Sequence, residues 1–415
     1  MGALDDWLAA QETASAGAMA AAISATGLTH RRPGFGQSVV PAAGSVLASP
    51  EDAHWDPEPD YFYHWTRDAG VVMMAAALVR DADPAAWDHR FADYAAFSLR
   101  TATRPWTGPN PLRPTTDAAH VRFLRADADL ALSGDRLLGE PRVNADGTPD
   151  FEDWSRPQFD GPPLRVLSCL AWPGVPPAEA HVLLGLDLAH VLAHAAEPAI
   201  GPWEDPPPAR HAFTLLAQRA ALRAGRARLD AGAADAAIAR IDAALSDLWD
   251  GEAGHMRASS IAPRGESDAN IVLGALLEAD DAAPFGVCDP WMIATADHVE
   301  AWSRLRFPIA TETAPLVGRW PRDVYFGGHP WLPTSFGFAE FYYRRAAASA
   351  LPQAERDRCR ARGDLILDAV RAAFPEPGAL PEQLDGTTGA PASCRNLTWS
   401  HAALIVAAHA RRAAG

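Results

Sequence analysis

The sequence predicts an all-α fold. Segments of helical periodicity recur along the 415 residues, whereas the two-residue alternation of β-branched and aromatic residues that is typical of strands is scarce. Two kinds of helix are expected. Residues 231–248 carry one apolar stripe, whereas 71–79 and 402–410 are apolar nearly all round. The mixture indicates amphipathic helices arranged around buried ones.

About a dozen helices follow in order along the chain, separated by loops dense in Pro, Gly and Asp. A ring of buried helices inside a ring of amphipathic ones would give this pattern and gather the long loops over one end. A buried bundle or a helical solenoid would also mix the two kinds, but no fixed-period repeat favours a solenoid. The expected ranges are 4–24, 67–80, 84–103, 117–133, 161–171, 177–196, 210–225, 231–248, 267–278, 290–305, 330–349, 353–374 and 397–412.

Length and charge narrow the functional class. No Ser/Gly linker or charge block divides the chain, so we expect one domain spanning 1–415. The 52 acidic residues outnumber the 36 basic ones, which are all arginine, and the net charge is -16. This excess disfavours nucleic acid and anionic membrane surfaces as partners, and fits a neutral substrate.

Cysteines and apolar runs give little sign of special chemistry or targeting. The four cysteines are far apart and are expected to be isolated thiols. Residues 1–27 lack a basic start followed by an apolar core, so no export signal is predicted. The compartment is then cytoplasmic at face value, or periplasmic or secreted if a leader has been removed. No run approaches the roughly 18 apolar residues that span a membrane.

Five clusters combine aromatic side chains with Arg, Asp or Glu in loops or at helix starts. Rings stack on the apolar faces of a pyranose, and carboxylates and guanidinium groups bind its hydroxyls, so the clusters predict a sugar pocket. Alternatively, the rings cap the core and the charged neighbours form structural ion pairs. The clusters are 61–68, 154–161, 203–205, 319–325 and 380–385.

Glu204 and Glu382 lie in two of these clusters and form a candidate acid and base. Breaking a glycosidic bond requires one carboxylic acid that protonates the leaving oxygen and one carboxylate that activates water or attacks the sugar. The alternative for Glu204 is an exposed acid near a helix start, where negative charge is favourable. For Glu382 it is a solvated loop acid.

Other kinds of site have weaker support. His190 and His194 lie four residues apart on an expected helix, with Asp187 one turn earlier, and could share a metal-facing side. The Glu of a metalloprotease motif is missing, so no metal site is predicted. Gly-x-Ser-x-Gly, Gly-x-Gly-x-x-Gly and P-loop motifs are also absent. Neither a metal nor an organic cofactor is expected.

In order and spacing, these clusters resemble the glucoamylases of glycoside hydrolase family 15, particularly the fungal-type catalytic domain. The resemblance runs almost end to end. It implies an (α/α)6 barrel, a six-hairpin toroid with its active site in the loops at one end. It also implies an exo-acting hydrolase that releases glucose from non-reducing ends with inversion. The matching strings are LDDWL (4–8), PDYFYHWTRD (59–68), WSRPQFDGP (154–162), DAN (268–270), GRWPRDVY (318–325) and NLTWS (396–400).

The resemblance also implies roles for individual residues. Glu204 falls on the general acid, Glu382 on the general base and Ser393 on a serine that orients the base. Glu204 must then stay protonated near neutral pH while Glu382 stays ionised, with the carboxyl groups about 6.5–9.5 Å apart. The positions implied to line the sugar subsites are Tyr61, Trp65, Arg67, Asp68, Trp154, Arg156, Trp203, Asp205, Arg319 and Trp331.

The chain departs from the fungal pattern around the expected acid. Gly201 and Pro202 precede Trp203, Asp205 replaces a Glu, and prolines occupy 206–208. Trp320 stands where the family usually has Tyr. These positions would touch the second sugar, so we expect a leaving-group site with its own linkage or aglycone preference.

The substrate expected from the resemblance is a malto-oligosaccharide or a related short α-glucan. We expect a monomer without a starch-binding domain. An α-1,6 glucosidase or a trehalase-like hydrolase on the same fold is the nearest alternative. A sugar-binding protein without turnover is the alternative from another class.

Overall fold

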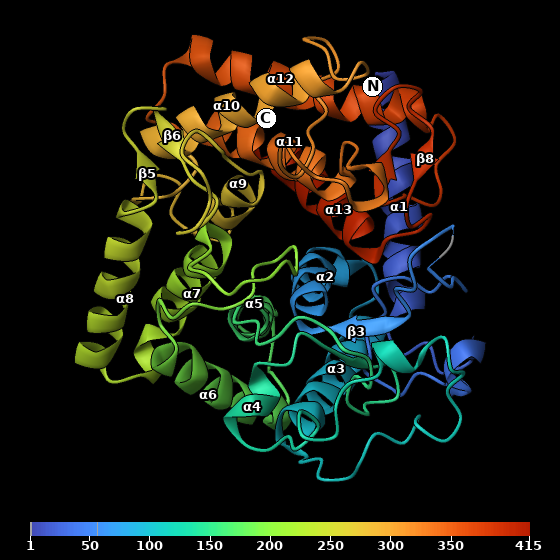
Figure 1. Ribbon diagram of the computed structural model, residues 1–415. Helices are drawn as coiled ribbons and strands as arrows, with labels where there is room; N and C mark the ends of the chain where they lie inside the picture. The colour runs from blue at the N-terminus through green and yellow to red at the C-terminus, as the bar shows by residue number, and fades with distance from the viewer. Residues whose placement is uncertain (1, 56) are drawn as a thin grey trace. The chain divides into compact units, whose positions relative to one another are not determined.

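The computed structural model describes residues 2–55 and 57–415, and it is predominantly helical (Figure 1). Most of its length consists of helices joined by long loops. The α-helices are α1 Ala3–Ala22, α2 Thr66–Val79, α3 Pro84–Thr103, α4 Asp135–Leu138, α5 Gly161–Ala171, α6 Ala178–Ala193, α7 Ala212–Gly225, α8 Ala231–Ser246, α9 Asn270–Ala275, α10 Pro290–Arg306, α11 Leu332–Ala347, α12 Gln353–Ala373 and α13 Thr398–Ala413.

The strands are short and form two-stranded antiparallel sheets. They occur in loops between helices, where they fix the course of the backbone. The pairs are β1 His30–Arg32 with β2 Gln37–Val39, β3 Tyr63–Trp65 with β4 Arg142–Asn144, β5 Trp249–Asp250 with β6 His255–Met256, and β7 Gln383–Leu384 with β8 Pro391–Ala392.

The helical prediction is confirmed for twelve of the expected ranges and is wrong for 117–133. That segment contains turns and a short 3-10 helix, η3 Val121–Phe123. Its backbone instead makes hydrogen bonds to segments that are distant in sequence. Arg125 N–H donates to Phe151 O at 2.9 Å, and Leu132 N–H donates to Trp106 O at 2.8 Å. Arg125 is fully buried, and its guanidinium donates two hydrogen bonds to Glu140 at 2.7 and 2.8 Å. These bonds need an extended course, which a helix would not supply.

The four cysteines are free thiols, as expected. Among the described residues, no helix combines the length and apolar character that crossing a bilayer requires.

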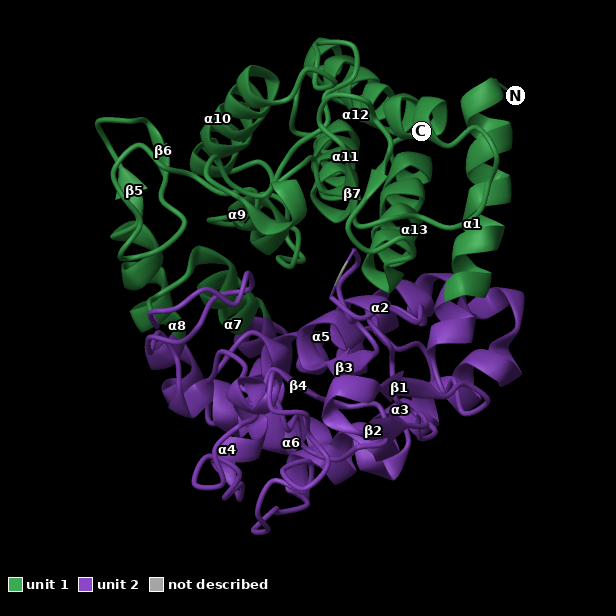
Figure 2. Ribbon diagram, turned by 45° about the vertical axis from the view of Figure 1, so that its right-hand side comes forward, with its two compact units in different colours: residues 1–18, 209–220, 238–415 green, residues 19–208, 221–237 purple. Residues whose placement is uncertain are grey.

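The chain divides into two compact units, coloured separately in Figure 2. Unit 1 comprises residues 1–18, 209–220 and 238–415. Unit 2 comprises 19–208 and 221–237. Glu204 therefore belongs to unit 2 and Glu382 to unit 1.

In unit 2, α2 packs against α5, and α6 packs against both α3 and α5. The contact between α2 and α5 depends on Gly70, where a Cβ atom would lie 2.9 Å from the Leu164 Cβ. Such a distance is too short for two carbon atoms, so any larger residue would push the helices apart. The first turn of α2 carries Arg67 and Asp68, and this packing fixes its position.

In unit 1, α11 packs against α9, α12 and α13. Almost all of α11 is buried, as expected for a helix that is apolar on most faces. Its first residue follows Trp331 directly, and Leu332 N–H donates to Glu382 O at 2.9 Å. This bond ties the loop that carries Glu382 to the start of a buried helix.

Candidate active site

Glu204 lies in a tight turn held against a neighbouring loop. Its N–H donates to Gly201 O at 2.9 Å, and Gln158 pairs with Ile200 in a parallel bridge. The backbone of Glu204 has φ 68°, a left-handed conformation that costs a residue other than glycine about 1–3 kcal/mol. The surrounding bonds hold it there.

Three side chains donate hydrogen bonds to the Glu204 carboxylate. Trp65 Nε1 and Gln158 Nε2 donate to Oε1 at 2.9 and 3.0 Å, and Trp154 Nε1 donates to Oε2 at 2.8 Å. An indole N–H is only a donor, so the two bonds from Trp65 and Trp154 have a fixed direction. The orientation of the carboxylate is thereby set.

One guanidinium serves three carboxylates beside this group. Arg67 lies 3.3 Å from Asp68, 3.4 Å from Asp160 and 3.6 Å from Glu204. Burial raises the pKa of Asp68 to about 7; the charges of Glu204 and Asp160 add to this shift, and Arg67 opposes it. Burial also raises the pKa of Asp160. The cluster therefore retains a proton at a pH where an exposed aspartate has lost it.

Arg142 supports the rings around Glu204. It is fully buried, and its guanidinium lies 4.0 Å from the ring centroid of Tyr63, 4.9 Å from Trp65 and 3.7 Å from Trp154. It donates to Asp150 at 2.9 Å, which balances its charge. Because β3 pairs Trp65 with Arg142 on β4, the ring and the cation are fixed in register.

The remaining subsite residues that the sequence predicts in unit 2 differ in their contacts. Tyr61 contacts Trp65 edge to face at 5.6 Å. Arg156 turns to other partners: it donates to Trp154 O at 2.7 Å and to Asp150 at 3.2 Å. Trp203 is half-buried and Asp205 is exposed.

In unit 1, Glu382 is buried and bonded through both oxygens. Trp331 Nε1 donates to Oε1 at 3.1 Å, and Ser393 Oγ donates to Oε2 at 2.5 Å. The pair β7 and β8 brings Ser393 back beside Glu382, and Glu382 N–H donates to Cys394 O at 2.7 Å. The expected contact between Ser393 and Glu382 is thus present. Ser393 also has a left-handed backbone, with φ 61°.

Arg319 is buried and makes two hydrogen bonds to Asp323, both of 2.7 Å. Its guanidinium lies 4.7 Å from the Trp320 ring and 5.0 Å from the Tyr325 ring. A planar cation held by a carboxylate and two rings has little freedom to reorient. Its direction is therefore set before a ligand arrives.

His190 and His194 share a carboxylate that the sequence reasoning missed. Asp135 on α4 accepts from His190 Nδ1 at 2.5 Å and from His194 Nε2 at 2.7 Å. Asp187, the partner considered from spacing, instead pairs with Arg165 at 2.6 Å. Asp135, His190 and His194 bring their ligand atoms within 4.8 Å of one another. The separations of Asp135 from the two rings are those of hydrogen bonds.

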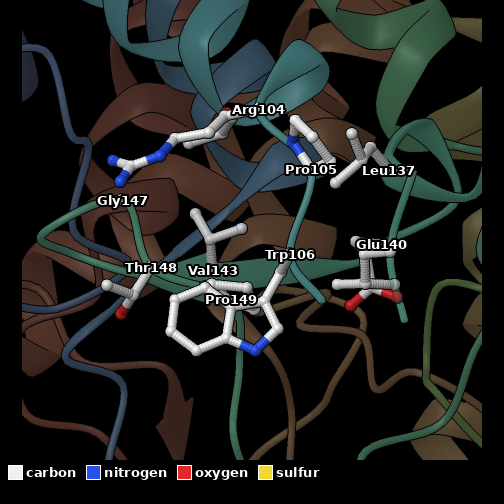
Figure 3. A pocket seen from close by; sticks show the side chains of 11 residues that line it. Arg104, Pro105, Trp106, Leu137, Glu140, Val143, Gly147, Thr148 and Pro149 are labelled. Atoms are coloured by element: carbon white, nitrogen blue, oxygen red, sulfur yellow. The ribbon is translucent and has the colours of Figure 1, made fainter. Parts of the chain in front are cut away.

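Two cavities of unit 2 differ greatly in size. One beside β4 has a volume of about 50 Å³, and Figure 3 shows Trp106 and Glu140 among its lining residues. It has room for a water molecule or two but not for a sugar. The other, of about 630 Å³, is lined by Trp154, Arg156, Pro206 and Pro208 among others. The prolines that depart from the fungal pattern thus share a cavity with two expected subsite residues.

Residues 35–356 match the model of the glycosyl hydrolases family 15. The chain belongs to this family. It is 26% identical to glucoamylase-1 of Schizophyllum commune, in an alignment that covers 92% of this chain and 71% of that protein. It is also 26% identical to a probable glucoamylase of Schizosaccharomyces pombe, over 89% of this chain and 85% of that protein.

The solved glucoamylase of Hormoconis resinae superposes with a TM-score of 0.78 at 23% identity, over 98% of this chain and 74% of that one. This likeness confirms the expected fold, the (α/α)6 barrel of family 15. Membership of the family also makes the chain a glycoside hydrolase.

Gln158 and Asp160 belong to the 154–162 string, but nothing in the sequence analysis predicted that Gln158 contacts Glu204 or that Asp160 contacts Arg67. The signal that could have revealed these contacts is the position of both residues between Trp154, an expected subsite residue, and the start of α5. No sequence signal pointed to Arg142, because a lone Arg in a short strand has no distinctive pattern. Its importance depends on the three rings that surround it.

Proposed function

We propose that the chain is an inverting exo-acting α-glucoside hydrolase of glucoamylase type. Its substrates would be malto-oligosaccharides or related α-glucans, from whose non-reducing ends it releases glucose. The observation that carries this proposal is that indole N–H groups orient both carboxylates. Trp65 and Trp154 donate to Glu204, and Trp331 donates to Glu382. The family membership and the glucoamylase names of the relatives support it.

Glu204 acts as the general acid, and the proton resides on Oε2. Oε1 already accepts two hydrogen bonds, from Trp65 and Gln158, whereas Oε2 accepts one, from Trp154. A carboxyl oxygen with one acceptor position left can carry a proton and donate it. The glycosidic oxygen is therefore protonated on the side of Trp154.

Glu382 acts as the general base. Ser393 fixes one oxygen and Trp331 the other, so that the carboxylate keeps one orientation toward the attacking water. In an inverting enzyme this water lies between the base and the sugar. Arg67 and Asp68 hold the terminal glucose. The remaining subsite residues are Tyr61, Trp65, Trp154, Arg156, Trp203, Asp205, Arg319 and Trp331.

The initial rates of glucose release from maltose, maltotetraose, isomaltose and trehalose test the substrate class. We expect the two α-1,4 substrates to be the best. If they are the poorest, the enzyme is an α-1,6 glucosidase or a trehalase-like hydrolase. Proton NMR of the fresh product tests the mechanism: inversion gives β-glucose first, and α-glucose as the first product would contradict it.

Substitution tests the two carboxylates. Glu204→Gln and Glu382→Gln should each reduce kcat by about 10²–10⁴, the usual contribution of a positioned acid or base. Glu252→Gln is the control, because the Glu252 side chain is 88% exposed. If the parent and both variants bind maltose but release no glucose, the protein is a sugar-binding protein.

Residues 1–415 would act as one catalytic domain and as a monomer. The match to a solved glucoamylase over 98% of the chain supports the single domain. Light scattering coupled to size-exclusion chromatography tests the monomer. We expect the mass of one chain at all concentrations.

A further inference from the structure

Two histidines and one aspartate of unit 2 join α4 to α6. Asp135 is the first residue of α4, His190 lies in the last turn of α6, and His194 follows that helix directly. The spacing of the sequence supplied the two imidazoles, and the fold adds a carboxylate from a separate helix. Imidazole nitrogens together with a carboxylate are a ligand set that suits Zn²⁺, Co²⁺ and Ni²⁺. We call the three residues the His–Asp cluster.

The ligand atoms of the His–Asp cluster are close enough to bind one ion after a small movement. They all lie within 4.8 Å of one another, and Asp135 contacts His190 Nδ1 and His194 Nε2 through its two oxygens. Ligands held at about 2.0–2.1 Å around a tetrahedral ion are about 3.4 Å apart, so the carboxylate would withdraw by roughly 1 Å. The Asp135 side chain is 57% exposed, which leaves it room to do so.

Glu197 determines which nitrogen of His194 faces the cluster with a lone pair. His194 Nδ1 lies 2.6 Å from Glu197 Oε2, and an ionised carboxylate only accepts, so Nδ1 carries a hydrogen. In the neutral ring the lone pair is then on Nε2, which points at Asp135. A bare lone pair would repel that carboxylate, so Nε2 requires a second proton or a metal ion. Histidines that bind metals have this same arrangement, with a carboxylate on the nitrogen away from the ion.

His190 can change its tautomer without losing a partner at its other nitrogen. Its Nε2 is buried and has no hydrogen-bond partner among the described residues. An ion bound at Nδ1 would move the ring proton to Nε2 and would replace the hydrogen bond to Asp135. The Phe159 ring packs against both imidazoles, 5.4 Å from His190 and 4.5 Å from His194, and limits the reorientation of their planes.

The cavity of about 630 Å³ gives water and ions access to the His–Asp cluster, because Asp135 and His194 both line it. Water from the cavity could complete the coordination of an ion, as it does in zinc sites with three protein ligands. Acidic groups outnumber basic ones in the lining, and their excess favours a cation. They are Asp129, Asp135, Glu140 and Asp153, against Arg136 and Arg156.

We propose that the His–Asp cluster binds one divalent transition-metal ion of the zinc class. The ion would be bonded to His190 Nδ1, His194 Nε2 and an Asp135 oxygen, with water in the remaining position. It would fasten α4 to α6 and stabilise unit 2. This inference is independent of the proposed function, because it depends only on contacts around the cluster.

Calorimetric titration of the metal-stripped full chain with ZnCl₂ tests the proposal. We expect one site, and His194→Gln and Asp135→Asn should each weaken its affinity by about tenfold or more. His181→Gln is the matched control, because this histidine is an exposed residue of the same helix and should leave the affinity unchanged. CaCl₂ should not compete, since Ca²⁺ prefers oxygen ligands. Absence of Zn²⁺ binding by the parent would overturn the proposal, as would equal affinity in the two cluster variants.

Cobalt and thermal melts provide two further readouts. Co²⁺ with four ligands absorbs visible light far more strongly than the aqueous ion, so the parent should develop a visible band that His194→Gln lacks. At a Zn²⁺ concentration of 100 times Kd, the Tm of the parent should rise by about 3 °C. Asp135→Asn, a change at a largely exposed side chain, should show no rise. The spectrum of the aqueous ion, or an equal rise in the parent and in Asp135→Asn, would refute the site.

Discussion

Asp68→Asn should change how the stability of the protein depends on pH. Asp68 has a pKa raised to about 7 by burial, against an ordinary value of 3.8. An acid with a raised pKa contributes stability that is fully present below about pH 4 and is lost as the pH rises through about 7. The asparagine keeps the shape of the protonated acid and has no such loss. The variant should therefore become the more stable protein as the pH rises.

The expected difference in stability between the Asp68→Asn variant and the parent follows from the raised pKa of Asp68. A pKa raised from 3.8 to about 7 corresponds to about 4 kcal/mol, which is an upper value because the charges of Arg67, Glu204 and Asp160 act on the same carboxyl group. With an unfolding entropy of about 2.1 cal/mol/K per residue, this amounts to a Tm difference of about 5 °C for a chain of 415 residues.

Thermal melts of both proteins from pH 4 to pH 8 measure this difference. Near pH 4 the two Tm values should agree within about 1 °C, and near pH 8 the variant should melt about 5 °C higher. Asp323→Asn is the control, because Asp323 makes two hydrogen bonds to buried Arg319 and its loss should destabilise the protein at pH 8. A variant of Asp68 that melts lower than the parent at pH 8 would show that Arg67 requires an ionised Asp68.

Three further substitutions test the contacts of the site and the core. Trp154→Phe removes the hydrogen bond to Glu204 and should lower kcat about tenfold with little change in Tm; an unchanged kcat would contradict the role given to Oε2. Ser393→Gly removes the bond to Glu382 but suits the left-handed backbone, so kcat should fall about tenfold while Tm changes by less than about 2 °C; Ser393→Ala should be the less stable of the two. Arg125→Met removes the two hydrogen bonds to buried Glu140, leaving it only Arg156 at 3.4 Å, and should destabilise the protein by about 3–5 kcal/mol in urea unfolding; a loss below about 1 kcal/mol would indicate that the pair is dispensable.

The sequence predicted helix boundaries well where capping residues and apolar periodicity were both present. The ranges 84–103 and 161–171 agree with α3 and α5 at both ends. For α3 the reason is visible, because Asp83 caps the helix through Ala86 N–H and Pro84 is its first residue. Such signals involve residues a few positions apart, so the sequence displays them directly.

The segment 117–133 shows where local reasoning fails. Its composition allows a helix, but Arg125 must reach Glu140, and its backbone must pair with Phe151. Buried charge pairs of this kind outweigh propensity because an unpaired buried charge costs several kcal/mol. Nothing in the spacing of residues 117–133 reveals the partner.

The resemblance proposed the two candidate acids and one orienting serine, but it did not supply most of the contacts that surround them. Glu204, Glu382 and Ser393 came from the resemblance of long strings, and in the structure Ser393 donates a hydrogen bond to Glu382. The position of Arg142 against Trp154 depends on the fold, since its guanidinium lies against rings from two separate segments, Tyr63 and Trp65 on β3 and Trp154 in a loop. The amide of Gln158 beside Glu204 and the cation against Trp154 were visible only in the structure.

Glu204 and Ser393 share a further feature, which is a strained, left-handed backbone conformation. Both residues have positive φ, and glycine would adopt either conformation at no steric cost. The chain instead keeps side chains there, and each one makes hydrogen bonds within a candidate catalytic cluster. Strain of about 1–3 kcal/mol per residue persists only where neighbouring contacts determine the backbone, and such positions gather at functional sites. Among the described residues, seven other than glycine have positive φ, and two of them are the proposed acid and the residue that orients the proposed base, although neither assignment used backbone geometry.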